Sequence, residues 1–128
     1  MIVYLDTSAA LAHLFAEDRV PPAELWEQPL VSSRLLEYEI WTRVHARRLL
    51  ATHGEAARLL ISHVAMLELA HPVLSRALEP FPTAVRTLDA LHLASIEFLR
   101  ARGQDVRLAA YDDRMLEAAQ RLGIPLYF

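Results

Sequence analysis

The sequence predicts a three-layer α/β/α fold with a central parallel sheet of about five short strands. Short aliphatic runs alternate with longer segments of helical spacing, which is typical of a parallel sheet with right-handed helical crossovers. The 128 residues contain no long Gly-, Pro- or Ser-rich linker, and 54% of them are hydrophobic. We therefore expect a single domain over residues 1–128, with enough apolar side chains for an α/β core.

The first half of the chain begins with a strand. The run over 2–5 is β-branched and aliphatic and stops at Asp6, as buried parallel strands do. The polar residues that follow predict a helix over 8–17, which Pro21 and Pro22 then interrupt. The next predicted elements are a short helical piece over 24–28, a strand over 29–33 and a long helix over 35–50.

The second half repeats the alternation of helices and strands. Gly103 is placed to end the helix that begins near residue 86, because glycine adopts the left-handed conformation of a helix C-terminus. The other predicted elements are helices over 55–67, 72–78 and 113–122, and strands over 67–70, 106–111 and 125–128.

The composition excludes several classes of chemistry. Cysteine is absent, so disulfides, thiolate zinc sites and cysteine nucleophiles are impossible. All 13 basic residues are Arg, which removes Schiff-base and P-loop lysines, and the three glycines form no nucleotide-binding loop. The opening MIVYLDTS lacks a basic region and meets an acid early. We therefore expect no signal peptide and a cytoplasmic location.

Asp89 is the first candidate functional residue. It lies in the first turn of the helix RTLDALHLASIEFL, over residues 86–99. A carboxylate beside an apolar face costs several kcal/mol unless something pairs with it. Asp89 therefore requires a partner. The expected buried stripe of this helix comprises Leu88, Leu91, Ala94, Ser95 and Phe98.

Three further acids are placed to meet Asp89. Asp6 and Asp112 follow predicted strands, and Glu39 lies about two turns into the helix after the second strand. Ligands of parallel sheets bind at the carboxyl ends of the strands, so the four acids are expected at one edge. Carboxylates brought together repel one another, and a divalent cation such as Mg²⁺ or Mn²⁺ relieves that repulsion.

Four stretches resemble the PIN-domain ribonucleases, specifically the VapC-type toxins of toxin–antitoxin pairs. They are VYLDTSAALA (3–12), SSRLLEYEI (32–40), RTLDALHLAS (86–95) and AAYDDRMLEAAQRLGIPL (109–126). The resemblance implies a PIN-like, Rossmann-like fold and RNA phosphodiester hydrolysis by one or two Mg²⁺ or Mn²⁺ ions. It implies that the family's acids are Asp6, Glu39, Asp89 and Asp112 in this chain.

The same resemblance implies partners. A VapC-type toxin acts on RNA and is paired with a small antitoxin. We expect an apolar antitoxin segment to pack on the helices over 35–50 and 55–67, and its Arg or Lys to reach Asp6, Asp89 or Asp112. The resemblance and the apolar content together lead us to expect a homodimer.

Other residues are secondary candidates. Asp113 is adjacent to Asp112 and ranks behind it. Thr7 and Ser8 form an ordinary helix N-cap or orient Asp6, and the cap is favoured. The other secondary candidates form a basic face for RNA, namely Arg43, Arg47 and Arg48. A pair between Arg43 and Glu39 is an equal alternative for that face.

His92, three residues after Asp89, is either a metal ligand or a packed, hydrogen-bonded imidazole, and the packed imidazole is favoured.

The main alternative is a PIN fold that binds RNA or protein without cleaving it. Ala110 occupies a position where many family members have Thr or Ser, and this departure is the feature in its favour. A receiver-like domain and a haloacid-dehalogenase-type phosphatase also place acids at strand ends. Both use a lysine that this chain does not have.

Overall fold

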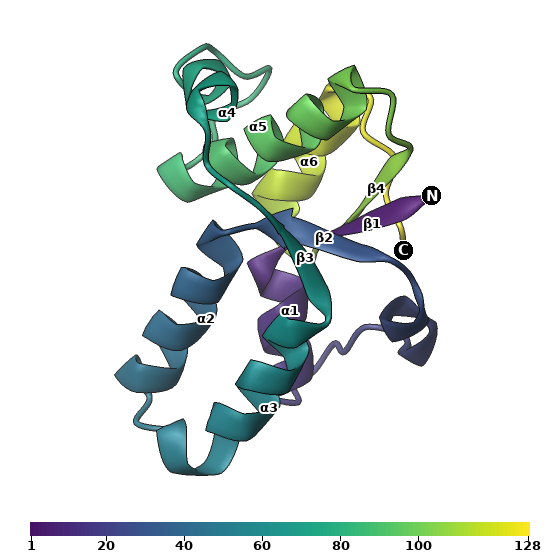
Figure 1. Cartoon of the computed structure of the whole chain (residues 1–128). Coiled ribbons are helices and arrows are strands. Elements are labelled where there is room, and N and C mark those ends of the chain that lie inside the picture. Colours follow the sequence, from purple (N-terminus) through teal and green to yellow (C-terminus); the bar gives the residue numbers. More distant parts are fainter.

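A computed structural model describes the whole chain, residues 1–128. Four parallel strands form one sheet in the order β3-β2-β1-β4 (Figure 1). Their bounds are β1 Ile2–Leu5, β2 Leu30–Ser33, β3 Val64–Leu67 and β4 Val106–Ala109. The predicted α/β architecture with a central parallel sheet is confirmed. The fifth strand expected over 125–128 is reduced to one bridge, between Leu108 and Leu126.

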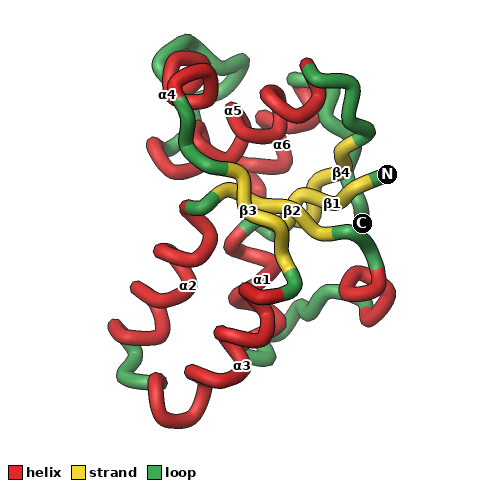
Figure 2. The backbone as a smooth tube through the Cα atoms, in the orientation of Figure 1, coloured by secondary structure: helices red, strands yellow, loops and turns green.

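Helices cover both faces of the sheet, as the tube view shows (Figure 2). One layer contains α1 Thr7–Leu14, α2 Leu35–Ala46 and α3 Leu50–Ser62, with the short 3₁₀ helix η1 Ala23–Glu27 beside it. The other contains α4 His71–Ala77, α5 Thr87–Ala101 and α6 Asp113–Arg121. None of these helices has both the length and the apolar character needed to cross a membrane.

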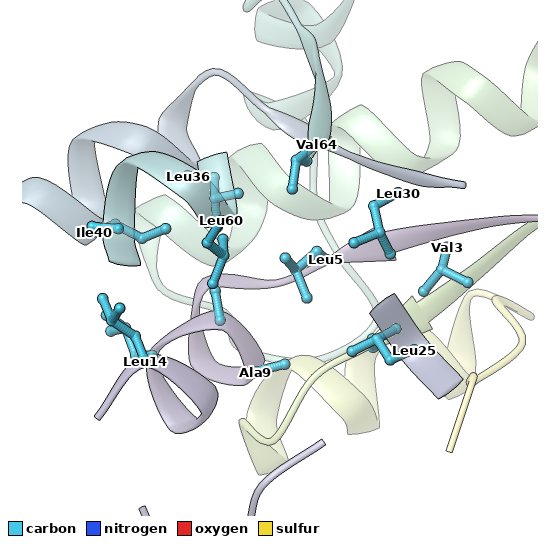
Figure 3. Packing of buried hydrophobic residues seen from close by; sticks show 14 of the residues in the cluster. Val3, Leu5, Ala9, Leu14, Leu25, Leu30, Leu36, Ile40, Leu60 and Val64 are labelled. Carbon is cyan, nitrogen blue, oxygen red and sulfur yellow. The ribbon is translucent and has the colours of Figure 1, made fainter. Parts of the chain in front are cut away.

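Successive residues of a strand contribute in turn to the two hydrophobic cores, one on each face of the sheet. Side chains of a strand point to opposite faces in turn, so Val3 and Leu5 pack against the α1–α3 layer (Figure 3), while Tyr4 packs against α5 and α6. The first core includes Leu36 and Ile40 of α2. Because both faces of β1 are covered, this strand is apolar throughout until Asp6.

Three predicted elements differ from the observed ones. The helix predicted over 35–50 ends at Ala46, because Arg48 adopts a positive φ of 56° in a tight turn, and α3 begins at Leu50. Gly54 does not precede α3 but lies buried inside it. The third strand is Val64–Leu67 instead of 67–70, since the apolar run there fits both a helical and a strand period.

The buried face of α5 also differs from the predicted stripe. Leu88, expected in the stripe, is 45% exposed. The buried residues of α5 are Ala90 and the run His92–Ile96. The reason is that α5 contacts α4 and α6 as well as β2 and β4, so it is covered on more than one side. At its start, only Thr87 and Leu88 are exposed. Gly103 follows α5 with a φ of 84°, as predicted.

Candidate functional site

The predicted acids lie in one cleft. In the order β3-β2-β1-β4, the connections reverse direction between β1 and β4, which is where open parallel sheets bind ligands. Asp6 follows β1 and Asp112 follows β4, and both line a cleft of about 690 Å³. The other acids on its wall are Glu39, Asp89 and Glu17, and its basic residues are Arg19, Arg43 and Arg86.

Asp6 is the N-cap of α1. Its Oδ2 accepts hydrogen bonds from the backbone N–H of Ser8, 3.1 Å away, and from the Ser8 hydroxyl. The Ser8 hydroxyl oxygen in turn accepts the N–H of Tyr111 at 2.9 Å, which ties α1 to the end of β4. The cap favoured for Thr7 and Ser8 is formed by Asp6 instead, and Ser8 orients the Asp6 carboxylate, which was the alternative for these residues. Burial raises the pKa of Asp6, although His92 and Ser8 oppose the rise.

Glu39 is held by two donors on other elements. Its Oε1 accepts from the Thr7 hydroxyl at 2.7 Å and from Nε2 of His92 at 2.6 Å. It forms no ion pair with Arg43, so the predicted alternative of an Arg43–Glu39 pair is not observed. Thr7 therefore orients a carboxylate of the cleft instead of capping a helix.

His92 is a packed, hydrogen-bonded imidazole, as favoured from the sequence. It is 1% exposed, and its Nδ1 lies 2.8 Å from the Tyr4 hydroxyl. Burial alone would lower the pKa of His92. Contact with Tyr4, the hydrogen bond to Glu39 and the negative charge of Asp6 outweigh burial and raise the pKa well above its usual value. These contacts therefore favour the protonated imidazole, which would offset part of the negative charge of the cleft.

Asp89 has an oxygen without a hydrogen-bond partner. Its side chain is 13% exposed, and Oδ2 is buried with no hydrogen bond, 3.6 Å from Nε of Arg86. Burial raises the pKa of Asp89, and the charges of Asp112 and Asp6 raise it further. Asp89 is thus the acid whose ionised form is least compensated by internal donors.

Asp112 is the N-cap of α6. Its Oδ1 accepts from the N–H groups of Arg114 and Met115, at 3.0 and 3.1 Å. Its Oδ2 pairs with Nη2 of Arg86 at 3.0 Å. Asp113 is exposed in the first turn of α6 and is not part of the cleft wall.

The basic residues separate into two groups. Arg43 lines the cleft, whereas Arg47 lies at the end of α2 over the ring of Phe15, and Arg48 lies in the following turn. Sequence reasoning missed Arg86, although its position three residues before Asp89 is the spacing at which helical side chains meet.

The donor set fits a hard divalent cation. All four predicted ligands present carboxylate oxygens, which Mg²⁺ and Mn²⁺ prefer, and one buried oxygen of Asp89 has no other partner. No three acidic or imidazole side chains lie close enough to form a ready-made cage. The acids are instead held by internal donors: Ser8 for Asp6, Thr7 and His92 for Glu39, and Arg86 for Asp112.

The chain is similar to a known domain family and to two ribonucleases over most of its length. Residues 3–121 match the PIN domain family. The chain is 35% identical to ribonuclease VapC46 and 29% identical to ribonuclease VapC47, both of Mycobacterium tuberculosis, over 95% of this chain and 93% of each relative.

The structural comparison shows the fold alone. The crystal structure of M. tuberculosis VapC20, a toxin that cleaves the sarcin-ricin loop, superposes with a TM-score of 0.66 at 21% identity. The match covers 91% of this chain and 94% of VapC20. The family match extends over nearly the whole chain, and the relatives match it end to end, so this chain belongs to the PIN domain family.

Proposed function

We propose that the chain is a Mg²⁺- or Mn²⁺-dependent endoribonuclease and the toxin of a toxin–antitoxin pair. One observation carries the proposal: four carboxylates from distant segments line one cleft, together with arginines that suit a phosphate backbone. The relatives named as ribonucleases support the same reaction. The substrate class is therefore RNA, cut at a phosphodiester bond.

The acids of the cleft, Arg43 and the residues that hold Glu39 have separate roles in this proposal. Asp6, Asp89 and Asp112, with Glu39, would hold the cation. The cation would supply an activated water and neutralise charge on the phosphate. Arg43 attracts the RNA backbone from the cleft wall. His92 and Thr7 fix the carboxylate of Glu39 through their hydrogen bonds.

A PIN fold that binds without cleaving is less well supported. The argument for it depends on the missing hydroxyl at Ala110. That side chain is 2% exposed and packs in the core with Met115, and it is not part of the cleft wall. A hydroxyl at this position would lie among apolar side chains. Ala110 therefore offers no reason to expect an inactive site.

Amide substitutions test the carboxylates. We expect Asp6→Asn, Asp89→Asn and Asp112→Asn each to lower RNA cleavage in Mg²⁺ or Mn²⁺ by about 100-fold or more, because each removes a charged ligand. Glu39→Gln is expected to reduce cleavage as well. The matched control is Asp113→Asn, which removes an exposed acid outside the cleft and leaves cleavage intact.

Circular dichroism of each variant checks that the fold is retained. Undiminished cleavage by all three Asp variants would refute the mechanism. Binding of RNA by the native protein with no cleavage in either metal would favour the binding module.

An antitoxin is the expected protein partner. The helices α2 and α3 expose apolar side chains, among them Tyr38, Leu50 and Leu59, which an amphipathic segment would cover. We expect a basic side chain of that segment to pair with Asp6, Asp89 or Asp112, so inhibition by the antitoxin should weaken in saturating Mg²⁺ and in high salt. Equal inhibition at every Mg²⁺ concentration would show that the antitoxin only blocks access for RNA.

We also propose a homodimer. Leu78 is 88% exposed, and with Leu74 and Phe81 it lines an apolar cleft of about 600 Å³ beside α5. Apolar surface of this kind is normally covered by a partner. Sedimentation equilibrium of the purified chain tests the proposal, and a monomer at micromolar concentration would contradict it.

A further inference from the structure

Arg86 connects two of the proposed metal ligands. Its Nη2 lies 3.0 Å from Oδ2 of Asp112, and its Nε lies 3.6 Å from Oδ2 of Asp89. The guanidinium belongs to the residue that precedes α5, and the side chain is 65% exposed. It therefore places a permanent positive charge between two carboxylates while its other side faces solvent.

The oxygens that Arg86 contacts are those with the fewest other partners. Oδ1 of Asp112 is engaged by the start of α6, which leaves Oδ2 for Arg86 alone. Oδ2 of Asp89 has no hydrogen bond at all. A cation entering the cleft would need the same two oxygens. The guanidinium and the metal thus compete for one set of ligands.

We propose that Arg86 is an internal cation that occupies Asp89 and Asp112 in the metal-free protein, leaves them when metal binds, and then binds the phosphate of the substrate. The inference rests on the proposed function, because it concerns the metal and RNA of that site. It rests on the placement of one guanidinium between the side chains of Asp89 and Asp112.

The release of Arg86 couples metal binding to substrate binding. While the guanidinium is paired with carboxylates, its charge is compensated and unavailable to an anion. Once displaced, the side chain stays attached at the rim of the same cleft, where its planar fork can bind a phosphate in a bidentate manner. The side chain lies outside the packed core, since it is 65% exposed, and its only ion pairs are with Asp89 and Asp112.

The first test measures metal affinity. We expect Arg86→Ala to bind Mn²⁺ about three- to tenfold more tightly than the native protein in isothermal titration calorimetry, because a competing charge-assisted pair is gone. Arg43→Ala is the matched control: it removes the same charge from the same cleft, but Arg43 forms no ion pair with an acid. Its Mn²⁺ affinity should change by less than about twofold.

The second test measures binding of a fluorescent single-stranded oligodeoxynucleotide, which carries the backbone phosphates of RNA, by anisotropy with and without Mn²⁺. Arg86→Ala should weaken binding by about tenfold with Mn²⁺ and by less than about twofold without it. Arg43→Ala should weaken binding equally in both conditions. Gel analysis confirms that the probe stays intact.

Either of two results would overturn the inference: an equal or weaker Mn²⁺ affinity of Arg86→Ala relative to the control, or the same loss of oligonucleotide binding with and without metal. The inference and the proposed function can fail separately. If no RNA is cleaved but Arg86→Ala still binds Mn²⁺ more tightly, only the ribonuclease activity is refuted. If RNA is cleaved but the two Arg variants bind Mn²⁺ alike, only the role of Arg86 is refuted.

Discussion

Tyr4 links the core of the protein to its cleft. The side chain is fully buried, and its hydroxyl accepts the N–H of Ser33 at 3.0 Å and contacts Nδ1 of His92. The other ring nitrogen of His92 holds Glu39. A residue of β1 thus fixes, through one imidazole, a carboxylate on α2. Such a chain of buried hydrogen bonds orients groups only when every member has its partner.

Removing one oxygen from this chain should destabilise the fold. We expect Tyr4→Phe to lower the free energy of unfolding by about 1–3 kcal/mol, because it leaves the buried N–H of Ser33 without an acceptor and Nδ1 of His92 without its hydrogen-bond partner. Tyr38→Phe is the control, since Tyr38 is 69% exposed and its hydroxyl forms no hydrogen bond within the chain. Urea denaturation measures both. An equal stability of the two variants would show that the hydroxyl of Tyr4 contributes nothing to the fold.

A substitution at Asp89 should have the opposite effect on stability, because its ionised carboxylate destabilises the fold. Its pKa is raised above 3.8 by burial and by Asp112 and Asp6, so the folded chain holds the proton more tightly than the unfolded chain. That stabilisation is complete below the unfolded pKa and is lost as pH rises through the folded pKa. At neutral pH the ionised Asp89 therefore destabilises the metal-free protein.

We accordingly expect Asp89→Asn to raise the melting temperature by about 2–6 °C in EDTA at pH 7, or about 1 kcal/mol for a domain of this size. The gain should be smaller at pH 4 than at pH 7, because the raised pKa of Asp89 lets the native side chain take up a proton as pH falls. Differential scanning calorimetry at both pH values tests this. A lower melting temperature of the variant at pH 7 would mean that the pair with Arg86 outweighs burial and repulsion.

At the scale of elements, two acids of the site also begin helices. Asp112 caps α6 through Oδ1, while Oδ2 pairs with Arg86 in the cleft, so its structural role and its proposed role in metal binding can be separated by substitution. Asn keeps a capping oxygen, whereas Ala removes it at a cost of about 1 kcal/mol. We expect Asp112→Ala to be less stable than Asp112→Asn by that amount in urea denaturation, although both are expected to lower RNA cleavage. Equal stability would show that the cap contributes little.

The acids were predictable because strand ends are visible in sequence. Asp6 and Asp112 each follow a β-branched or aliphatic run, and parallel strands bring such positions to one edge. Positions within helices were harder to predict. Gly54 is typical of a helix boundary but lies inside α3, where the nearest atom to an added Cβ would be the flexible end of Leu50 at 3.1 Å. Helix periodicity could not predict that burial.

The partners of the acids were not predictable. His92 and Glu39 are 53 residues apart, and Arg86 and Asp112 are 26 apart, so their contacts depend on how α2, α5 and α6 pack. The spacing of His92 and Asp89 even suggested a shared metal. In the structure the imidazole turns toward Tyr4 and Glu39 instead. Local spacing indicates which residues share a face but not what the opposite element presents.

At the scale of the whole molecule, the sheet separates two cores and exposes one polar edge. The α1–α3 core and the α5–α6 core lie on opposite faces of the same strands, and the cleft opens where β1 and β4 end. Acids supplied from both layers therefore meet at a place that neither core covers. A cation bound there would connect α1, α2, α5 and α6, so it should stabilise the molecule as a whole.

The stabilisation of the fold by such a cation should depend on pH. Burial raises the pKa of both Asp6 and Asp89, so protons compete with metal as pH falls, while in EDTA the same ionised groups destabilise the fold as pH rises. The melting temperature in Mn²⁺ should thus exceed that in EDTA by more at pH 7.5 than at pH 5.5. At 100 times the dissociation constant the metal contributes about 2.7 kcal/mol. Asp6→Asn should reduce this difference and Asp113→Asn should preserve it. A difference that does not vary with pH would show that Mn²⁺ stabilises the protein without displacing protons from these two carboxyl groups.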